Sequence, residues 1–231
     1  MAESFDASVA FTDPEYRQAV VDLLGVIAYG EISAFERLVE DAKLAPTLED
    51  KFALATMASA EFSHVHGLND RIRSFGGDPF EAMAPFREAI DGFHAHTAPA
   101  DWYEGLVKAY VGDGLASDFY REIAAYLDPD TRDVVLSAMD DTQHSVFVVD
   151  RVRKAIGADP RLGGRLALWG RRLMGEALTQ AQRVAADRDA LTALLAGGVD
   201  RPGLDLAALG RMFARLTERH SKRMAELGLD P

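Results

Sequence analysis

The chain has 231 residues, of which 48% are hydrophobic and 27% are charged, so it can form one large domain or two small ones with a real core. Its formal net charge of −12 argues against a dedicated nucleic-acid surface, because phosphate binding rests on lysine and arginine. The absence of cysteine excludes disulfides, iron–sulfur clusters and thiolate catalysis in this chain, and leaves carboxylate and histidine as the strong metal ligands.

Residues 1–12 carry two acidic side chains and no basic cluster, so they are predicted to be a flexible N-terminus and not a signal peptide. No stretch approaches the roughly 18 to 20 uninterrupted apolar residues that a membrane span needs. By default, we therefore expect a cytoplasmic protein without a membrane segment.

Two predicted helices follow and form an antiparallel hairpin. The first begins at Asp13, a predicted N-cap with proline at the next position, and runs to Asp41. A short turn over 44–47 reverses the chain. Thr47 and Asp50 resemble a capping box in acidic form, and the second helix runs from there to about residue 75, where a Gly-Gly-Asp-Pro stretch ends it.

A long linking segment over 80–100, predicted to be partly helical, crosses to a second hairpin. Its helices are expected over 101–127 and 131–156, and two more follow over 162–193 and 204–227. Short, long and short connections are those of a four-helix bundle in which one crossover joins two hairpins. The predicted fold is all-α. A single domain spans 1–231, with the bundle over 13–156 and two additional C-terminal helices over 157–231 that pack on it.

Two short motifs, or phrases, contain the candidate metal ligands: Glu61-Phe-Ser-His64 and Asp141-Thr-Gln-His144. Residues three apart share a helix face, so each phrase offers one carboxylate and one imidazole that point the same way. Two such helices, plus one lone carboxylate from each of two others, hold two metal ions in the core of a four-helix bundle.

The sequence also supplies the lone acids. Glu31 lies about as far before the turn of the first hairpin as Glu61 lies after it. In the second hairpin Asp141 is roughly matched by Asp113, with Asp118 as the rival. A glycine precedes both Glu31 and Asp113, which leaves room for a close helix or for a ligand.

A single Glu-x-x-His phrase on a helix is usually solvated, but two of them with acids at matching heights are much less expected by chance. Unpaired buried charges cost several kcal/mol, so acids in the core need a compensating cation. A set of carboxylates with imidazole favours iron or manganese.

The other histidines and one further acid are interpreted more simply. His66 is expected at the surface, and His94 and His96 are assigned to a turn or the surface in preference to an entrance. His220 has no matching partner in the sequence. Glu176 is expected to form a salt bridge with an arginine in preference to supporting the metal ligands.

On Glu31, Glu61-x-x-His64, Asp113 and Asp141-x-x-His144, the chain resembles the ferritin-like di-iron superfamily. Within it, the chain is most similar to the tRNA hydroxylase-like branch related to the enzyme that hydroxylates 2-methylthio-N6-isopentenyladenosine in tRNA. The resemblance covers roughly 13–156 and implies a ferritin-like bundle whose four carboxylates and two histidines hold two irons, with manganese or a mixed pair as alternatives. Aspartate replaces glutamate at 113 and 141, which shortens both side chains by one methylene.

The resemblance also implies roles for these residues. His64 and His144 would be terminal nitrogen ligands, Glu61 and one of the aspartates would bridge the metals, and Glu31 and Asp113 would be terminal carboxylates.

The implied activity is that of a di-iron hydroxylase or monooxygenase that uses dioxygen. Its substrate would be a small organic molecule or a nucleoside, either free or within tRNA. The chain has no Gly-rich nucleotide fingerprint, so an external electron donor is expected, and a homodimer is compatible with the family. Two alternatives remain open: a ferroxidase or iron-handling protein, and a non-catalytic bundle with a structural or vestigial metal site.

Overall fold

The computed structural model describes residues 13–139, 144–196 and 206–231, and every regular element in these ranges is helical. This confirms the predicted all-α class. The elements in chain order are α2 (Pro14–Asp41), η1 (Ala42–Leu44), α3 (Leu48–Ser74), α4 (Pro79–Met83), η2 (Ala84–Phe86), α5 (Arg87–His96), α6 (Trp102–Ala124), α7 (Pro129–Ala138), α8 (His144–Ala158), α9 (Arg161–Asp187), α10 (Asp189–Ala196) and α11 (Leu206–Glu226).

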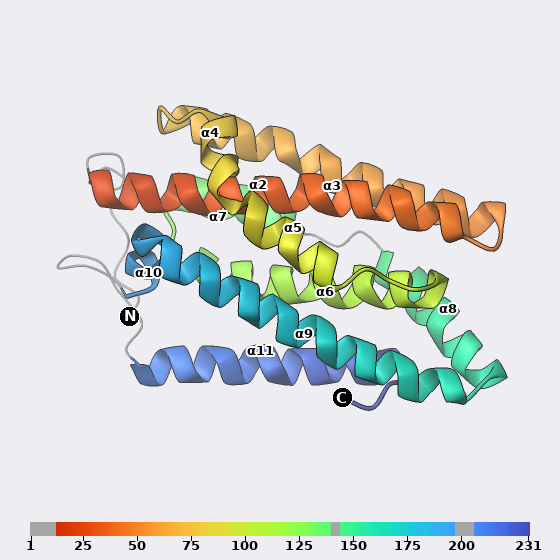
Figure 1. Cartoon of the computed structure of the whole chain (residues 1–231). Coiled ribbons are helices and arrows are strands. Elements are labelled where there is room, and N and C mark those ends of the chain that lie inside the picture. The colour runs from red at the N-terminus through yellow and green to blue at the C-terminus, as the bar shows by residue number, and fades with distance from the viewer. Residues whose placement is uncertain (1–12, 140–143, 197–205) are drawn as a thin grey trace.

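Helices α2 and α3 form the expected antiparallel hairpin and lie side by side (Figure 1). The Asp13 carboxylate accepts the backbone N–H of Glu15 at 2.9 Å, and the Thr47 hydroxyl accepts that of Asp50 at 3.1 Å. Both predicted caps are therefore present, and they satisfy backbone donors that the first turn of each helix leaves free. Fully buried aliphatic side chains join the two helices; they include Leu24, Ile27, Leu68 and Ile72.

The crossover is more helical than expected. The carboxylate of Asp78 caps α4 by accepting the backbone N–H groups of Phe80 and Glu81, and α4, η2 and α5 together occupy 79–96. Helix α5 then runs obliquely between α2 and α9 (Figure 1). This oblique course brings residues of the crossover to the centre of the bundle.

The continuous helix predicted over 131–156 is wrong. Helix α7 ends at Ala138, where the Met139 N–H donates to the Leu136 carbonyl at 3.1 Å in a tighter turn than the α-helix makes. Residues 140–143 lie outside the described part of the chain, and α8 begins at His144. The helical periodicity continues through this stretch, so it did not mark the end of α7.

The helix predicted over 162–193 is likewise two helices, α9 and α10. Between them lies Arg188, with φ −132° and ψ 82°, and its guanidinium donates two hydrogen bonds to Asp22 at 2.6 and 3.0 Å. A partly buried ion pair with α2 therefore anchors the chain at the point where the helix is interrupted. Helix α10 then packs on α2, while α9 packs on α6 and α5.

Helix α11 lies along α6 and is joined to it by a row of ion pairs (Figure 1). We call this row the α6–α11 ladder: Arg215 with Glu122 at 2.6 Å, Arg219 with Glu122 at 3.0 Å, and Arg223 with Asp118 at 2.6 Å. The ladder fixes the register of α11 on the bundle.

By length and composition alone, the segment Pro14–Leu44 could cross a membrane, although no membrane segment was expected. In the fold, 61% of its apolar window is buried against other helices. A central bundle helix meets the same criteria, so the segment is weak evidence for a membrane span.

The crossing of α2 and α4 leaves no room for a side chain at Gly25. A Cβ atom there would lie 2.3 Å from the backbone oxygen of Ala82. We expect Gly25→Ala to lower the free energy of unfolding by about 1–3 kcal/mol in urea titrations. Gly67→Ala is the control, because its Cβ would meet no atom within 4 Å, and it should raise stability by up to about 1 kcal/mol. Equal effects of the two changes would contradict the close approach.

Candidate metal centre

Three predicted ligands converge between α2 and α3. Glu31, Glu61 and His64 each offer one ligand atom, and these atoms all lie within 4.8 Å of one another. Nδ1 of His64 lies 3.1 Å from Oε2 of Glu31. The antiparallel hairpin therefore places Glu31 level with the Glu-x-x-His phrase, as its distance from the turn predicted.

The electrostatics of this cluster favour a cation. Glu31 is only 7% exposed. Its burial raises the pKa of its carboxyl to about 8, partly opposed by a hydrogen bond with Glu61 and reinforced by the negative charge of Asp113. A positive ion among these groups would relieve both the burial and the repulsion.

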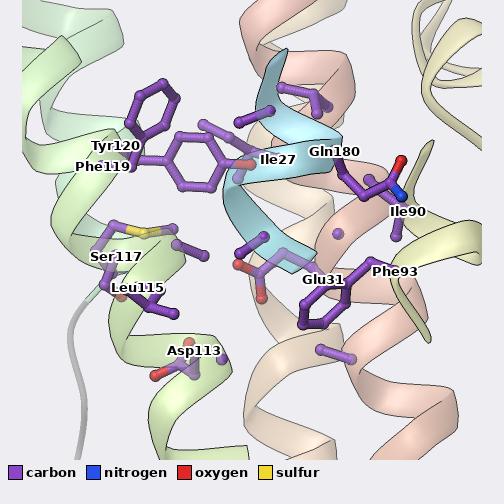
Figure 2. Close-up of a pocket in the computed structure, with 18 of the residues that line it drawn as sticks. Ile27, Glu31, Ile90, Phe93, Asp113, Leu115, Ser117, Phe119, Tyr120 and Gln180 are labelled. Atoms are coloured by element: carbon purple, nitrogen blue, oxygen red, sulfur yellow. The ribbon is translucent and has the colours of Figure 1, made fainter. Parts of the chain in front are cut away.

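Asp113 lies on α6, across the cavity from Glu31 on α2 (Figure 2), and lines the same cavity. Its rival Asp118 forms ion pairs with Arg223 at 2.6 Å and Arg219 at 3.6 Å, and it does not line the cavity. The geometry therefore favours Asp113 as the acid that α6 contributes.

The side chains of the remaining two predicted ligands, Asp141 and His144, are outside the described part of the structure. Asp141 lies outside the described residues. His144 begins α8, but its side chain is not among those described. The structure thus brings together Glu31, Glu61 and His64, with Asp113 on the wall of the same cavity, and the ligand role of all six residues stays a prediction.

A cavity of about 390 Å³ adjoins the cluster. Its α2 wall extends from Leu23 to Asp41, with Glu31 near the middle, and α3 together with all the helices from α5 to α11 complete it. Most of its walls are apolar, and Figure 2 shows Ile27, Ile90, Phe93, Leu115 and Phe119 among them. Such a cavity suits a small organic molecule.

The structure corrects the expectations for His94 and Glu176 and places the other two residues, His220 and His66. His94 lines the cavity, so its assignment to a turn or the surface is wrong. Glu176 accepts hydrogen bonds from Gln180 at 2.6 Å and pairs with His96 at 2.8 Å, where a salt bridge with an arginine was expected. His220 is buried, at 4% exposure, and lies outside the cavity lining. His66 is exposed, as expected.

Sequence reasoning also missed cavity residues that carry charge. Lys108 is 5% exposed and Asp41 is 8% exposed, and both line the cavity. A lysine in a helix is ordinarily solvated, and no pattern in the sequence distinguishes this one. The Thr97 carbonyl and the Phe93 ring, both distant from Lys108 in the sequence, lie against its ammonium group, and α9 packs on the same helix.

The two aspartates of α6 give a matched pair of variants. Asp113→Asn is expected to weaken ferrous iron binding at least tenfold with little change in stability, because it removes a candidate ligand from the cavity wall. Asp118→Asn should leave iron binding unchanged and lower the thermal midpoint, because it breaks the α6–α11 ladder. Iron affinity is measured by competition with a chelator, and stability is measured by thermal unfolding. Weaker iron binding in Asp118→Asn, with unchanged binding in Asp113→Asn, would make Asp118 the ligand.

The donor set of the cluster is two carboxylates and one imidazole, with a third carboxylate nearby. Such oxygen-rich sets with imidazole suit iron and manganese. In four-helix bundles, Glu-x-x-His helices facing lone glutamates hold paired metals of this kind. The residues present therefore fit a metal site of the predicted class.

Comparison with curated proteins gives no significant match. The family described as "ferritin-like domain, actinomycetes" matches residues 14–198, which include α2 to α10 and the whole cluster of Glu31, Glu61 and His64. Since this match extends over far more than half of the chain, the protein belongs to the actinomycete ferritin-like domain family.

Proposed function

We propose that this protein is a non-haem di-iron oxidoreductase that activates dioxygen and hydroxylates a small organic substrate. The observation that carries the proposal is the position of Glu31, Glu61 and His64, whose ligand atoms lie within 4.8 Å of one another on the wall of a largely apolar cavity. A metal site and an organic binding site would thus share one space.

The cavity favours a hydroxylase over the two alternatives. A metal that only staples the bundle needs no adjoining space of about 390 Å³. A ferroxidase takes iron as its substrate and needs a polar route for the ion, whereas the walls here are mostly aliphatic and aromatic. Apolar walls instead bind an organic molecule and exclude water from the reacting atoms.

In this proposal Glu31, Glu61 and His64, together with Asp113, Asp141 and His144, would hold the metal pair. The bound irons would supply the redox chemistry with dioxygen. A hydroxylation consumes R–H, O2, two electrons and two protons and yields R–OH and water, so an external electron donor is part of the proposal. A cytoplasmic location would give access to such a donor.

The nucleoside substrate of the tRNA hydroxylase-like branch is the less favoured choice. The net charge of −12 opposes RNA binding, and only the family resemblance supports it. A free small molecule that fits the apolar cavity is the better candidate.

Anaerobic titration with ferrous iron followed by an oxygen pulse tests the proposal. We expect binding of two irons per chain, slow oxygen consumption without a donor, and repeated turnover once a reductant and an organic substrate are supplied. Rapid oxidation of many irons per chain would favour the ferroxidase. Absence of iron binding, or bound iron that does not react with oxygen, would overturn the proposal.

A further inference from the structure

We propose that the cavity binds an amphipathic monocarboxylic acid, with its carboxylate beside Lys108 and His94 and its apolar body extending past Glu31 to the opposite end. As a statement about binding, this stands on the cavity alone. As a statement about the substrate, it rests on the proposed function.

The cationic end of the cavity centres on Lys108. Its ammonium group donates one hydrogen bond to the Thr97 carbonyl at 2.8 Å and lies 5.6 Å from the Phe93 ring centre. An ammonium group has three N–H donors, so two remain for a ligand. The charge of Asp41 acts on Lys108, but among the described residues no carboxylate approaches the ammonium closely enough for an ion pair.

His94 adds a neutral donor at the same end. Its Nδ1 is buried and has no hydrogen-bond partner among the described residues. Burial, with the positive charges of Lys108 and Arg37, lowers the pKa of the His94 imidazole to about 3, so the ring is neutral at pH 7. Burial is the larger cause of this shift, but the charges of Lys108 and Arg37, which are the lesser causes, favour an anion beside the ring.

The charges at this end limit a bound anion to one negative charge. Burial lowers the pKa of Lys108 to about 8, so it is mostly protonated at pH 7, and burial raises the pKa of Asp41 to about 6, so it is mostly ionised. Arg37 is already paired with Glu40 at 2.9 Å. With Asp41 ionised this end is already neutral, so a ligand gains chiefly from direct hydrogen bonds to Lys108, and a single carboxylate meets less repulsion from Asp41 and Glu40 than a phosphate dianion would.

The opposite end of the cavity is apolar. Its lining includes Leu23, Ile27, Phe119, Ile123, Leu191 and Leu194. From Leu23 to Asp41 the α2 wall rises about 27 Å at 1.5 Å per residue, and Glu31 lies near its midpoint. Figure 2 shows Ile27 and Phe119 on one side of Glu31 and Asp113 on the other. A molecule long enough to span this wall, held by its carboxylate at Lys108, therefore presents a carbon in the middle of its chain to the cluster, whereas a shorter acid tests the carboxylate end alone.

Calorimetric titration of the full-length protein with decanoate, before any metal is added, tests this inference. Relative to wild type, we expect Lys108→Met to bind decanoate about 10- to 100-fold more weakly, the usual effect of losing a hydrogen bond to a charged group. Lys51→Met, which changes an exposed lysine on α3, should bind as wild type does. Lys108→Arg keeps the charge and should recover part of the affinity.

The ligand itself gives a comparison that needs no variant. Wild type should bind 1-decanol at least tenfold more weakly than decanoate, because the alcohol lacks the carboxylate. Equal affinity for both, or equal affinity of wild type and Lys108→Met for decanoate, would overturn the inference.

The inference and the proposed function can fail separately. Decanoate binding that depends on Lys108 in a protein that binds no iron would leave the inference standing and overturn the proposed function. Normal iron binding and oxygen reactivity without decanoate binding would do the opposite.

Discussion

The His64→Ala variant is expected to bind ferrous iron more than about 100-fold more weakly than wild type. Loss of a group that only supports a metal ligand lowers metal affinity about 10- to 100-fold, and loss of a ligand itself should lower it further. His64 supplies the only imidazole of the described cluster, 3.1 Å from Glu31. Metal analysis after anaerobic loading measures the loss directly. Thermal unfolding gives a second readout, since iron should raise the midpoint of wild type and leave that of the variant unchanged.

His66→Ala is the matched control for this change. His66 lies two residues further along α3 and is exposed, so its loss should alter neither iron content nor the iron-dependent rise in thermal midpoint. Equal iron binding by wild type and His64→Ala would mean that the Glu31, Glu61 and His64 cluster is not a metal site.

The second large effect is expected from Asp128→Ala, with a loss of about 3–5 kcal/mol in the free energy of unfolding. Asp128 is 1% exposed and caps α7. Its carboxylate accepts hydrogen bonds from Arg71 at 2.7 Å, the Tyr16 hydroxyl at 3.0 Å and the Thr131 hydroxyl at 2.6 Å. Alanine would leave the Arg71 charge and the Tyr16 hydroxyl buried without this partner. Urea unfolding at pH 7 measures the loss.

Asp130→Ala is the control, because the side chain of Asp130 is 78% exposed and its contact with Arg71 is long, at 3.8 Å. A change of no more than about 1 kcal/mol is expected there. Similar losses at the two positions would show that the buried network around Asp128 contributes little.

The Asp128 network also predicts a pH dependence. Burial opposes ionisation of Asp128, but the hydrogen bonds from Thr131 and Tyr16 and the charge of Arg71 outweigh it and hold its pKa below the usual value. A lowered pKa gives stability that is fully present above the unfolded value of about 3.9 and is lost as the pH falls through the folded value. The stability difference between wild type and Asp128→Asn should therefore be constant from pH 7 to pH 5 and shrink below about pH 4.

The first hairpin was the most predictable part of the molecule, because its signals are local. The caps at Asp13 and Thr47 mark where its helices begin, and the turn between them fixes which residues lie at the same height. That symmetry alone placed Glu31 level with Glu61. The same reasoning left Asp118 as a rival of Asp113, and only the structure separates them, because Asp118 is paired with Arg223 and Asp113 lines the cavity.

The errors arise where distant contacts override a local pattern. Nothing near Arg188 in the sequence shows that Asp22, on α2, will bind its guanidinium and separate α9 from α10. Lysine and histidine side chains usually meet solvent, so nothing local shows that Lys108 and His94 will line a cavity that helices distant in the sequence enclose. Helical periodicity records which face is apolar, but not which neighbour will cover it.

Helix α11 lies beyond residues 14–198, yet Phe213 and Leu216 from this helix form part of the cavity wall. The part of the chain that matches the family thus carries Glu31, Glu61 and His64, whereas a helix outside the match forms part of the wall of the adjoining cavity. Under the proposed function, changes in α11 would alter which organic molecule fits the cavity. Substrate preference could then change without any substitution among the candidate metal ligands.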